Sequence, residues 1–214
     1  MMVDVYRHNQ LKRKYGNEQV LVMLTQDVQS VPDGFSLDID KNIKTRIWSS
    51  HRFIYRYDAE YNLALTQLIP YVVVTNTNED KLYVAERISG EERLRKTFQL
   101  GCGGHVNPSD VMGFDTIGTA AIREMNEELV IDTNTDEIYL LGTVRDLSSS
   151  TKEHLGIVYL VHSDDVSIRE KNTLRGQWMN MSDLILNYEK FESWARYIID
   201  HLFKNNKNSG KLFI

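Results

Sequence analysis

The feature that most constrains this chain is a group of three glutamates on one predicted helix. Apolar residues recur at helical spacing over residues 116–130, which predicts a helix there. Its acidic side holds Glu124, Glu127 and Glu128 within five positions. Like charges three or four residues apart on a helix repel by roughly 0.2–0.5 kcal/mol per pair. The grouping therefore predicts a cation that compensates the charge.

The residues before this helix form a glycine-rich loop. Asp115 stands where the helix would begin, and aspartate is among the best residues for capping a helix N-terminus. A strand predicted within residues 96–104 ends in glycines, which let a backbone approach a ligand closely. These glycines are Gly101, Gly103 and Gly104, and the apolar stripe of the helix consists of Ala121, Ile122, Met125 and Leu129.

The order of strand, glycine loop and acidic helix favours a site for a hard divalent cation. Mg²⁺ binds through a few carboxylates together with water and substrate phosphates. Bound there, it would polarise a phosphoryl oxygen and lower the pKa of a water molecule. Arg123 lies beside Glu124 and could orient that carboxylate. The plainer interpretation is a solvated acidic helix face, which is the most common fate of a charged run.

The stretch REMNEELVI, residues 123–131, resembles the second half of the Nudix box, G-x5-E-x7-R-E-U-x-E-E-x-G-U, in which U is a bulky aliphatic residue. In this alignment Gly104 matches the box glycine, Asp115 replaces the first glutamate, and Val130 replaces the last glycine. Gly104 precedes Asp115 by eleven positions instead of six, which places a five-residue insertion between them. The resemblance implies an α/β fold, the Nudix α/β/α sandwich around a mixed sheet, here with an N-terminal extension.

The resemblance also implies roles for the residues at matching positions. Glu127 and Glu128 would ligate Mg²⁺ or Mn²⁺, and Gly104 would offer its carbonyl oxygen. Glu124 would be a further ligand or the base that activates water, oriented by Arg123. The carboxylate that acts as the base varies among these enzymes, so this role stays open.

Several residues outside the acidic helix are candidates for contact with the substrate. Arg87, His105 and His154 could touch phosphates or a base. Many family members recruit a carboxylate from a loop after the box, and the candidates here are Glu153 and Glu170. Each of these residues also has an ordinary interpretation, as a surface charge or a packed histidine.

The rest of the chain predicts a sheet and a closing helix. Strands are predicted at 20–28, in a hairpin at 68–87, at 138–144, at 154–162 and near Trp178, with an amphipathic helix at 187–203. The predicted division is an N-terminal extension packed on the main domain at 1–67, a Nudix domain at 68–204 and a tail at 205–214. The extension could shape specificity, form a dimer interface or cover the sheet.

One stretch of the extension combines positive charge with aromatic rings. Residues 49–62 interleave Arg52 and Arg56 with three tyrosines. This pattern could line a site for an anionic ligand. A solvated strand or loop with aromatic packing is the simpler interpretation of the same residues.

Composition excludes several classes of function and partner. The 25 basic and 30 acidic residues give a net charge of -5, so no global positive field would hold nucleic acid. The single cysteine, Cys102, fits a reducing compartment. The N-terminal residues lack the apolar core of a signal peptide, and the apolar run at 68–74 is too short to span a bilayer. We expect a cytoplasmic protein without a membrane partner.

These inferences lead to one main functional hypothesis and two alternatives. The main one is a metal-dependent hydrolase that cleaves a diphosphate linkage in a nucleoside diphosphate joined to another group. Its partners would be small molecules, and it could form a homodimer. The first alternative is a Nudix-like module that senses a nucleotide metabolite without turnover. The second is an isopentenyl diphosphate isomerase, a Nudix relative that uses a cysteine, for which Cys102 is the candidate. The R-E-U-x-E-E form favours a hydrolase.

Overall fold

The structure, a computed structural model, describes residues 2–49, 52–89, 97–112, 115–131, 138–150, 152–169 and 171–205. The predicted site residue Glu170 lies outside the described residues. None of the helices in these ranges is long and apolar enough to cross a membrane.

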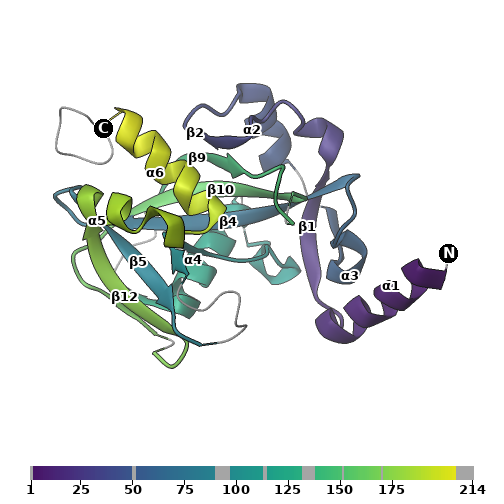
Figure 1. The fold of residues 1–214 in the computed structure, drawn as a ribbon. Coiled ribbons are helices and arrows are strands. Elements are labelled where there is room, and N and C mark those ends of the chain that lie inside the picture. The colour runs from purple at the N-terminus through teal and green to yellow at the C-terminus, as the bar shows by residue number, and fades with distance from the viewer. Residues whose placement is uncertain are drawn as a thin grey trace.

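One mixed sheet forms the centre of the protein (Figure 1). Its main path runs in the order β12-β5-β4-β10-β9-β2. The strands are β2 Gly34–Ser36, β4 Leu65–Thr75, β5 Lys81–Arg87, β9 Ile138–Arg145, β10 His154–His162 and β12 Leu174–Asn180. Strands β4 and β10 are parallel, and the other neighbours on the path are antiparallel. Every residue of β4 is buried, as expected for a strand covered on both faces.

Strand β4 is also the branch point of the sheet. Its first half pairs with β1 Gln19–Leu24, which in turn pairs with β3 Arg52–Tyr55. Its second half pairs with β7 Gly101–Gly103, while β6 Phe98–Gln99 pairs with β5. The register sets Val22 opposite Gln67 and Tyr71 opposite Gly103. The sheet therefore opens where β1 and β7 part, between Gln67 and Tyr71.

Two helices cover opposite faces of this sheet (Figure 1). Helix α4 Thr116–Glu128 buries Ile117, Ala121 and Met125 in one apolar cluster. Helix α6 Ser193–Asn205 buries Ile198 and Leu202 in a second cluster. The predicted α/β sandwich around a mixed sheet is confirmed.

The N-terminal part of the chain joins the sheet directly. It contributes β1, β2 and β3, together with α1 Met2–Tyr15, α2 Lys41–Trp48 and α3 Arg56–Ala59. Helix α1 lies at one end of the molecule, next to α3 (Figure 1). Strands β1 and β2 hydrogen-bond to β4 and β9, so this segment extends the sheet. The predicted boundary at residue 67 stays a prediction.

The remaining elements are short. They are η1 Thr25–Asp27, η3 Pro108–Asp110, η5 Tyr188–Lys190 and α5 Met181–Leu186, with β8 Leu129–Ile131 and β11 Val166–Ile168 paired in a separate two-stranded sheet.

Three predicted element boundaries are corrected by these elements. The strand predicted at 20–28 ends at Leu24, because Thr25 begins a 3-10 turn that Val28 closes. The acidic helix ends at Glu128, since Leu129 is already extended and starts β8. The last helix begins at Ser193 and not near residue 187, because the chain first passes through the 3-10 turn η5.

Candidate active site

Helix α4 begins at Thr116 and is capped by Asp115, as predicted. The Asp115 carboxylate accepts a hydrogen bond from the Gly118 amide at 2.9 Å, which confirms its role as the N-cap. The same Oδ1 atom accepts a second hydrogen bond from the Trp48 indole at 3.1 Å. Asp115 therefore serves the start of the helix and ties α2 to it.

Arg123 connects the acidic helix to the glycine loop. Its Nε and Nη2 atoms donate to the two carboxylate oxygens of Asp110 at 2.8 and 2.9 Å. Nη2 also donates to the His105 carbonyl at 2.9 Å, and Nη1 donates to Glu124 at 2.8 Å and Glu127 at 3.3 Å. The Asp110 side chain is only 3% exposed. Its hydrogen bonds to Arg123 raise the pKa of the guanidinium, so Arg123 stays charged at neutral pH.

Asp110 is the acidic partner that sequence reasoning missed. It follows Gly104 by six positions, which is the spacing between the glycine and the first glutamate of the Nudix box. The five-residue insertion therefore lies between Asp110 and Arg123, and the alignment of Asp115 with the first box glutamate is corrected. The box spacing counted forward from Gly104 leads to Asp110, whereas the box spacing counted back from Arg123 leads to Asp115, which is the helix cap.

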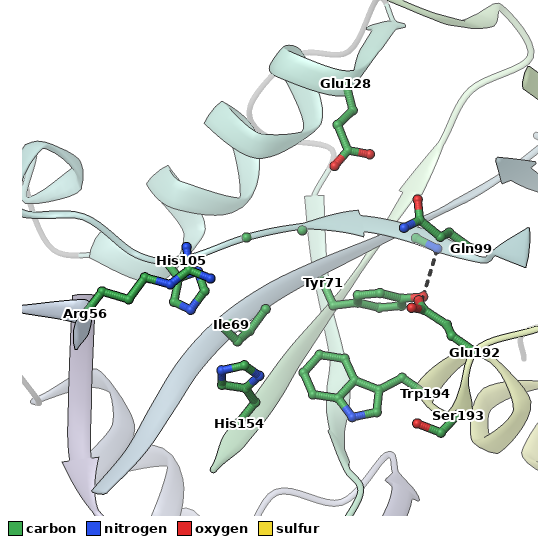
Figure 2. Close-up of a pocket in the computed structure, with 13 residues that line it drawn as sticks. Arg56, Ile69, Tyr71, Gln99, His105, Glu128, His154, Glu192, Ser193 and Trp194 are labelled. Atoms are coloured by element: carbon green, nitrogen blue, oxygen red, sulfur yellow. Dashed lines mark hydrogen bonds between the residues drawn. The ribbon is translucent and has the colours of Figure 1, made fainter. Parts of the chain in front are cut away.

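The three glutamates of α4 differ in their surroundings. The Glu124 side chain is 13% exposed, whereas Glu127 is 58% exposed. Burial raises the pKa of Glu124, and the hydrogen bond from Arg123 opposes that effect. Glu128, at the end of the helix, lines the neighbouring pocket (Figure 2). Across the described ranges, no group of three or more His, Cys, Asp or Glu side chains stands ready to hold a metal ion.

The donor atoms nevertheless suit a hard divalent cation. A Cβ atom on Gly104 would overlap the Glu124 carboxylate, so the loop backbone and this carboxylate lie in direct contact. Carboxylate and backbone carbonyl oxygens are ligands that Mg²⁺ accepts. The charge on Glu124 is disfavoured by burial, and a nearby cation would relieve that penalty. These residues therefore fit a divalent ion. Two of the three carboxylates, Glu124 and Glu127, accept hydrogen bonds from Arg123.

Replacing Gly104 by Ala tests this contact. The new Cβ would displace only the flexible end of Glu124, so we expect turnover to fall about 10²-fold with little change in Tm. In the matched variant Gly103→Ala, the Cβ would overlap the Pro70 carbonyl of β4, and the Tm should fall instead. Kinetics and thermal melts of both variants check this. Equal activity of Gly104→Ala and wild type would contradict the contact's role.

A pocket of about 380 Å³ adjoins Glu128 and the glycine loop. Figure 2 shows two groups of side chains on opposite sides of it, with Glu128 on the helix beyond. One group, which we call the aromatic arm, consists of Tyr71, Gln99, Glu192, Ser193 and Trp194. The other group, which we call the polar arm, consists of Arg56, His105 and His154.

The aromatic arm is ordered by Tyr71. Its hydroxyl accepts a hydrogen bond from the Gly101 amide and donates one to Glu192, both at 3.0 Å. The Tyr71 and Trp194 rings meet edge to face with centroids 5.7 Å apart. Burial raises the pKa of Tyr71, so the hydroxyl remains a donor at neutral pH. This arm therefore presents aromatic rings beside a carboxylate.

The structure brings only some of the predicted substrate residues to this pocket. His105 and His154 line it, whereas Arg87 and Glu153 do not. Glu153 is 3% exposed, and its carboxylate accepts a hydrogen bond from the Tyr61 amide at 3.4 Å. Its charge acts on the neighbouring pocket residue His154, where it opposes the lowering of the pKa by burial. A contact of Glu153 with the substrate stays a prediction.

Two pocket residues were not predicted as site residues, and the side chain of Cys102 does not line the pocket. Glu192 and Arg56 line the pocket from either side, although Arg56 belongs to the stretch noted for its arginines and tyrosines. Nothing in the local sequence distinguishes Glu192, which precedes α6. Cys102 is 5% exposed and does not line this pocket, and burial raises the pKa of its thiol. A buried thiol with a raised pKa is a poor reactive group, which disfavours the isomerase hypothesis.

The NUDIX domain family model matches residues 66–202. The chain belongs to the Nudix family. Protein YmaB from Bacillus subtilis strain 168 is 33% identical to this Nudix protein over 171 residues, which cover 75% of this chain and 82% of YmaB. Membership supports a hydrolase activity in general.

Solved structures show the same fold. The crystal structure of Tm1382, a candidate Nudix hydrolase, superposes with a TM-score of 0.74 at 24% identity, covering 87% of this chain and 99% of Tm1382. DR0079 from Deinococcus radiodurans gives a TM-score of 0.50 at 16% identity over 79% of this chain and 98% of DR0079. The likeness to Tm1382 spans more of the chain than residues 66–202, so it includes part of the N-terminal segment.

Proposed function

We propose that this Nudix protein hydrolyses a diphosphate linkage in a nucleoside diphosphate joined to another group. The observation that carries the proposal is the position of Glu128, which belongs both to the acidic face of α4 and to the wall of the pocket. A substrate in that pocket would lie beside the carboxylates. The substrate is a small molecule, and Mg²⁺ or Mn²⁺ is the proposed cofactor.

The residues of α4 and the glycine loop divide the work. Glu124, Glu127, Glu128 and the Gly104 carbonyl would hold the divalent ion. When bound, such an ion polarises a phosphoryl oxygen and lowers the pKa of water. Arg123 orients Glu124 through their 2.8 Å hydrogen bond, and Asp110 holds Arg123 in place.

A carboxylate must also take the proton from the attacking water. Glu124 and Glu128 are candidates on the helix, and Glu192 is a candidate on the other side of the pocket. Burial raises the pKa of Glu124, which would make it a better proton acceptor than an exposed glutamate. Glu124 and Glu128 are also proposed ligands of the ion, so glutamine at either position lowers turnover in any case. Turnover of the Glu192→Gln protein decides whether the base lies on the helix or across the pocket.

The experiment is phosphate release, after coupling to a phosphatase, from a panel of nucleoside diphosphate conjugates. We expect release in the presence of Mg²⁺ or Mn²⁺ and its loss when EDTA removes the metal. The panel contains sugar nucleotides, dinucleoside polyphosphates, nucleoside triphosphates and dinucleotide cofactors. Release that persists in EDTA, or no release from any compound, would contradict the proposal.

The second candidate is a binding module that senses a nucleotide metabolite without turnover. It is favoured by the hydrogen bonds of Arg123 to Glu124 and Glu127, which engage one oxygen of each carboxylate. A ligand that raises the Tm of the protein without forming product would support this candidate.

A further inference from the structure

The polar arm of the pocket contains buried nitrogens that lack hydrogen-bond partners. Arg56 Nε, His105 Nε2 and His154 Nε2 are all covered, and none of them has a hydrogen-bond partner within the described residues, although Arg56 Nε lies 3.8 Å from the Glu60 carboxylate. The two imidazole rings meet edge to face with centroids 5.5 Å apart. A buried polar group without a partner destabilises a protein, so three of them in one pocket wall indicate a site whose partner is a ligand.

A buried amide lies next to this arm. Gln67 on β4 pairs in register with His154 on β10 and is 0% exposed. Neither its Oε1 nor its Nε2 atom has a hydrogen-bond partner in the described part of the chain. The amide offers both a donor and an acceptor. Buried polar atoms without hydrogen-bond partners therefore extend from the pocket wall to the neighbouring position on β4.

The arm has little net positive charge to offer an anion. Arg56 Nη1 donates to both carboxylate oxygens of Glu18, at 3.0 and 3.2 Å, and Nε lies 3.8 Å from Glu60. These two glutamates compensate the guanidinium. Burial lowers the pKa of His154, which keeps its imidazole neutral at pH 7. A phosphate would find no unpaired cation in this arm.

We infer that the polar arm binds a neutral, hydroxyl-bearing group, such as a sugar, on the part of the substrate beyond the diphosphate. A hydroxyl both donates and accepts hydrogen bonds, which matches an arginine donor and a neutral imidazole. The inference rests on the proposed function, because it names the group attached to the diphosphate. It also gives the N-terminal segment a role in specificity, since Arg56 lies in α3.

The probes are two pairs of compounds that differ only in the attached group. ADP-ribose is compared with the ethyl ester of ADP, and UDP-glucose with the ethyl ester of UDP. We expect kcat/KM in Mg²⁺ to be at least about tenfold higher for at least one sugar than for its matched ester. Calorimetric binding in EDTA, where the proposed reaction stops, should show the same preference.

His154→Phe tests the arm itself. Phenylalanine keeps a ring of similar size and removes the unpaired nitrogen, so the Tm should stay equal or rise. KM for the preferred sugar should rise about tenfold and its advantage over the ester should disappear, with kcat little changed. The matched control is His162→Phe, at the far end of β10, where the histidine contacts Glu79 at 3.3 Å. This control should leave KM unchanged.

The outcomes separate this inference from the proposed function. Cleavage of sugar and ester with equal kcat/KM would overturn the inference and leave the hydrolase intact. Tighter sugar binding in EDTA, lost in His154→Phe, would support the inference even without turnover. Equal binding of both members of each pair, or no detectable binding of any of the four compounds, would overturn the inference. A His154→Phe protein with a large fall in Tm and an unchanged KM would overturn it too.

Discussion

Glu128→Gln is expected to lower turnover by about 10³-fold while the fold stays intact. Glu128 ends α4 and lines the pocket, so its carboxylate lies beside the proposed reaction. Losing one carboxylate from the cation site should remove several kcal/mol of transition-state stabilisation, and each 1.4 kcal/mol is about tenfold in rate. The measurement is kcat for the best substrate of the panel, together with a thermal melt.

The matched control for this substitution is Glu189→Gln. The Glu189 side chain is 87% exposed and lies 3.6 Å from Arg196, away from the pocket residues. It should keep both turnover and Tm. A Glu128→Gln protein with full activity, or one whose Tm collapses, would show that Glu128 has a different role.

Asp110→Asn is expected to be the most destabilising single change at the site. Asparagine cannot accept two charge-assisted hydrogen bonds from Arg123, and the guanidinium loses its best partner. We expect a loss of about 2–3 kcal/mol in the free energy of unfolding, which is less than for a fully buried pair because Arg123 is partly exposed. This loss should lower the Tm by about 5–10 °C. Turnover should fall too, because Arg123 would no longer hold Glu124.

Asp115→Asn is the control that decides between the two alignments. Asparagine caps helices as well as aspartate does, so this variant should lose less than about 0.5 kcal/mol. If Asp115→Asn were the more damaging of the two, Asp115 and not Asp110 would be the acidic partner of the box. Chemical denaturation of both proteins gives the comparison.

The acidic helix was predictable because its determinants are local. Helical periodicity, the Asp115 cap and the spacing of Glu124, Glu127 and Glu128 all lie within one segment. Asp110 was also predictable, because it follows Gly104 at the sequence spacing of the Nudix box. The insertion could lie before or after the acidic position of the box, and the contact of Arg123 with Asp110 places it between Asp110 and Arg123.

The pocket was less predictable because its walls come from distant parts of the chain. Arg56 reaches it through the pairing of β1 with β4, and Glu192 reaches it from the segment before α6. The arginines and tyrosines of residues 49–62 marked Arg56 only as a member of a possible anion site, and no local pattern marks Glu192. The role of the N-terminal strands in the sheet was hidden for the same reason, since edge pairing depends on partners far away in the sequence.

Binding of Mn²⁺ to the wild-type protein and to Glu128→Gln, followed by calorimetry, tests the central claim most directly. The claim is that the carboxylates of α4 hold a divalent ion beside the pocket. We predict that wild type binds Mn²⁺ and that the variant binds it at least about tenfold more weakly. Equal affinity in the two proteins, or no binding to wild type, would contradict the claim.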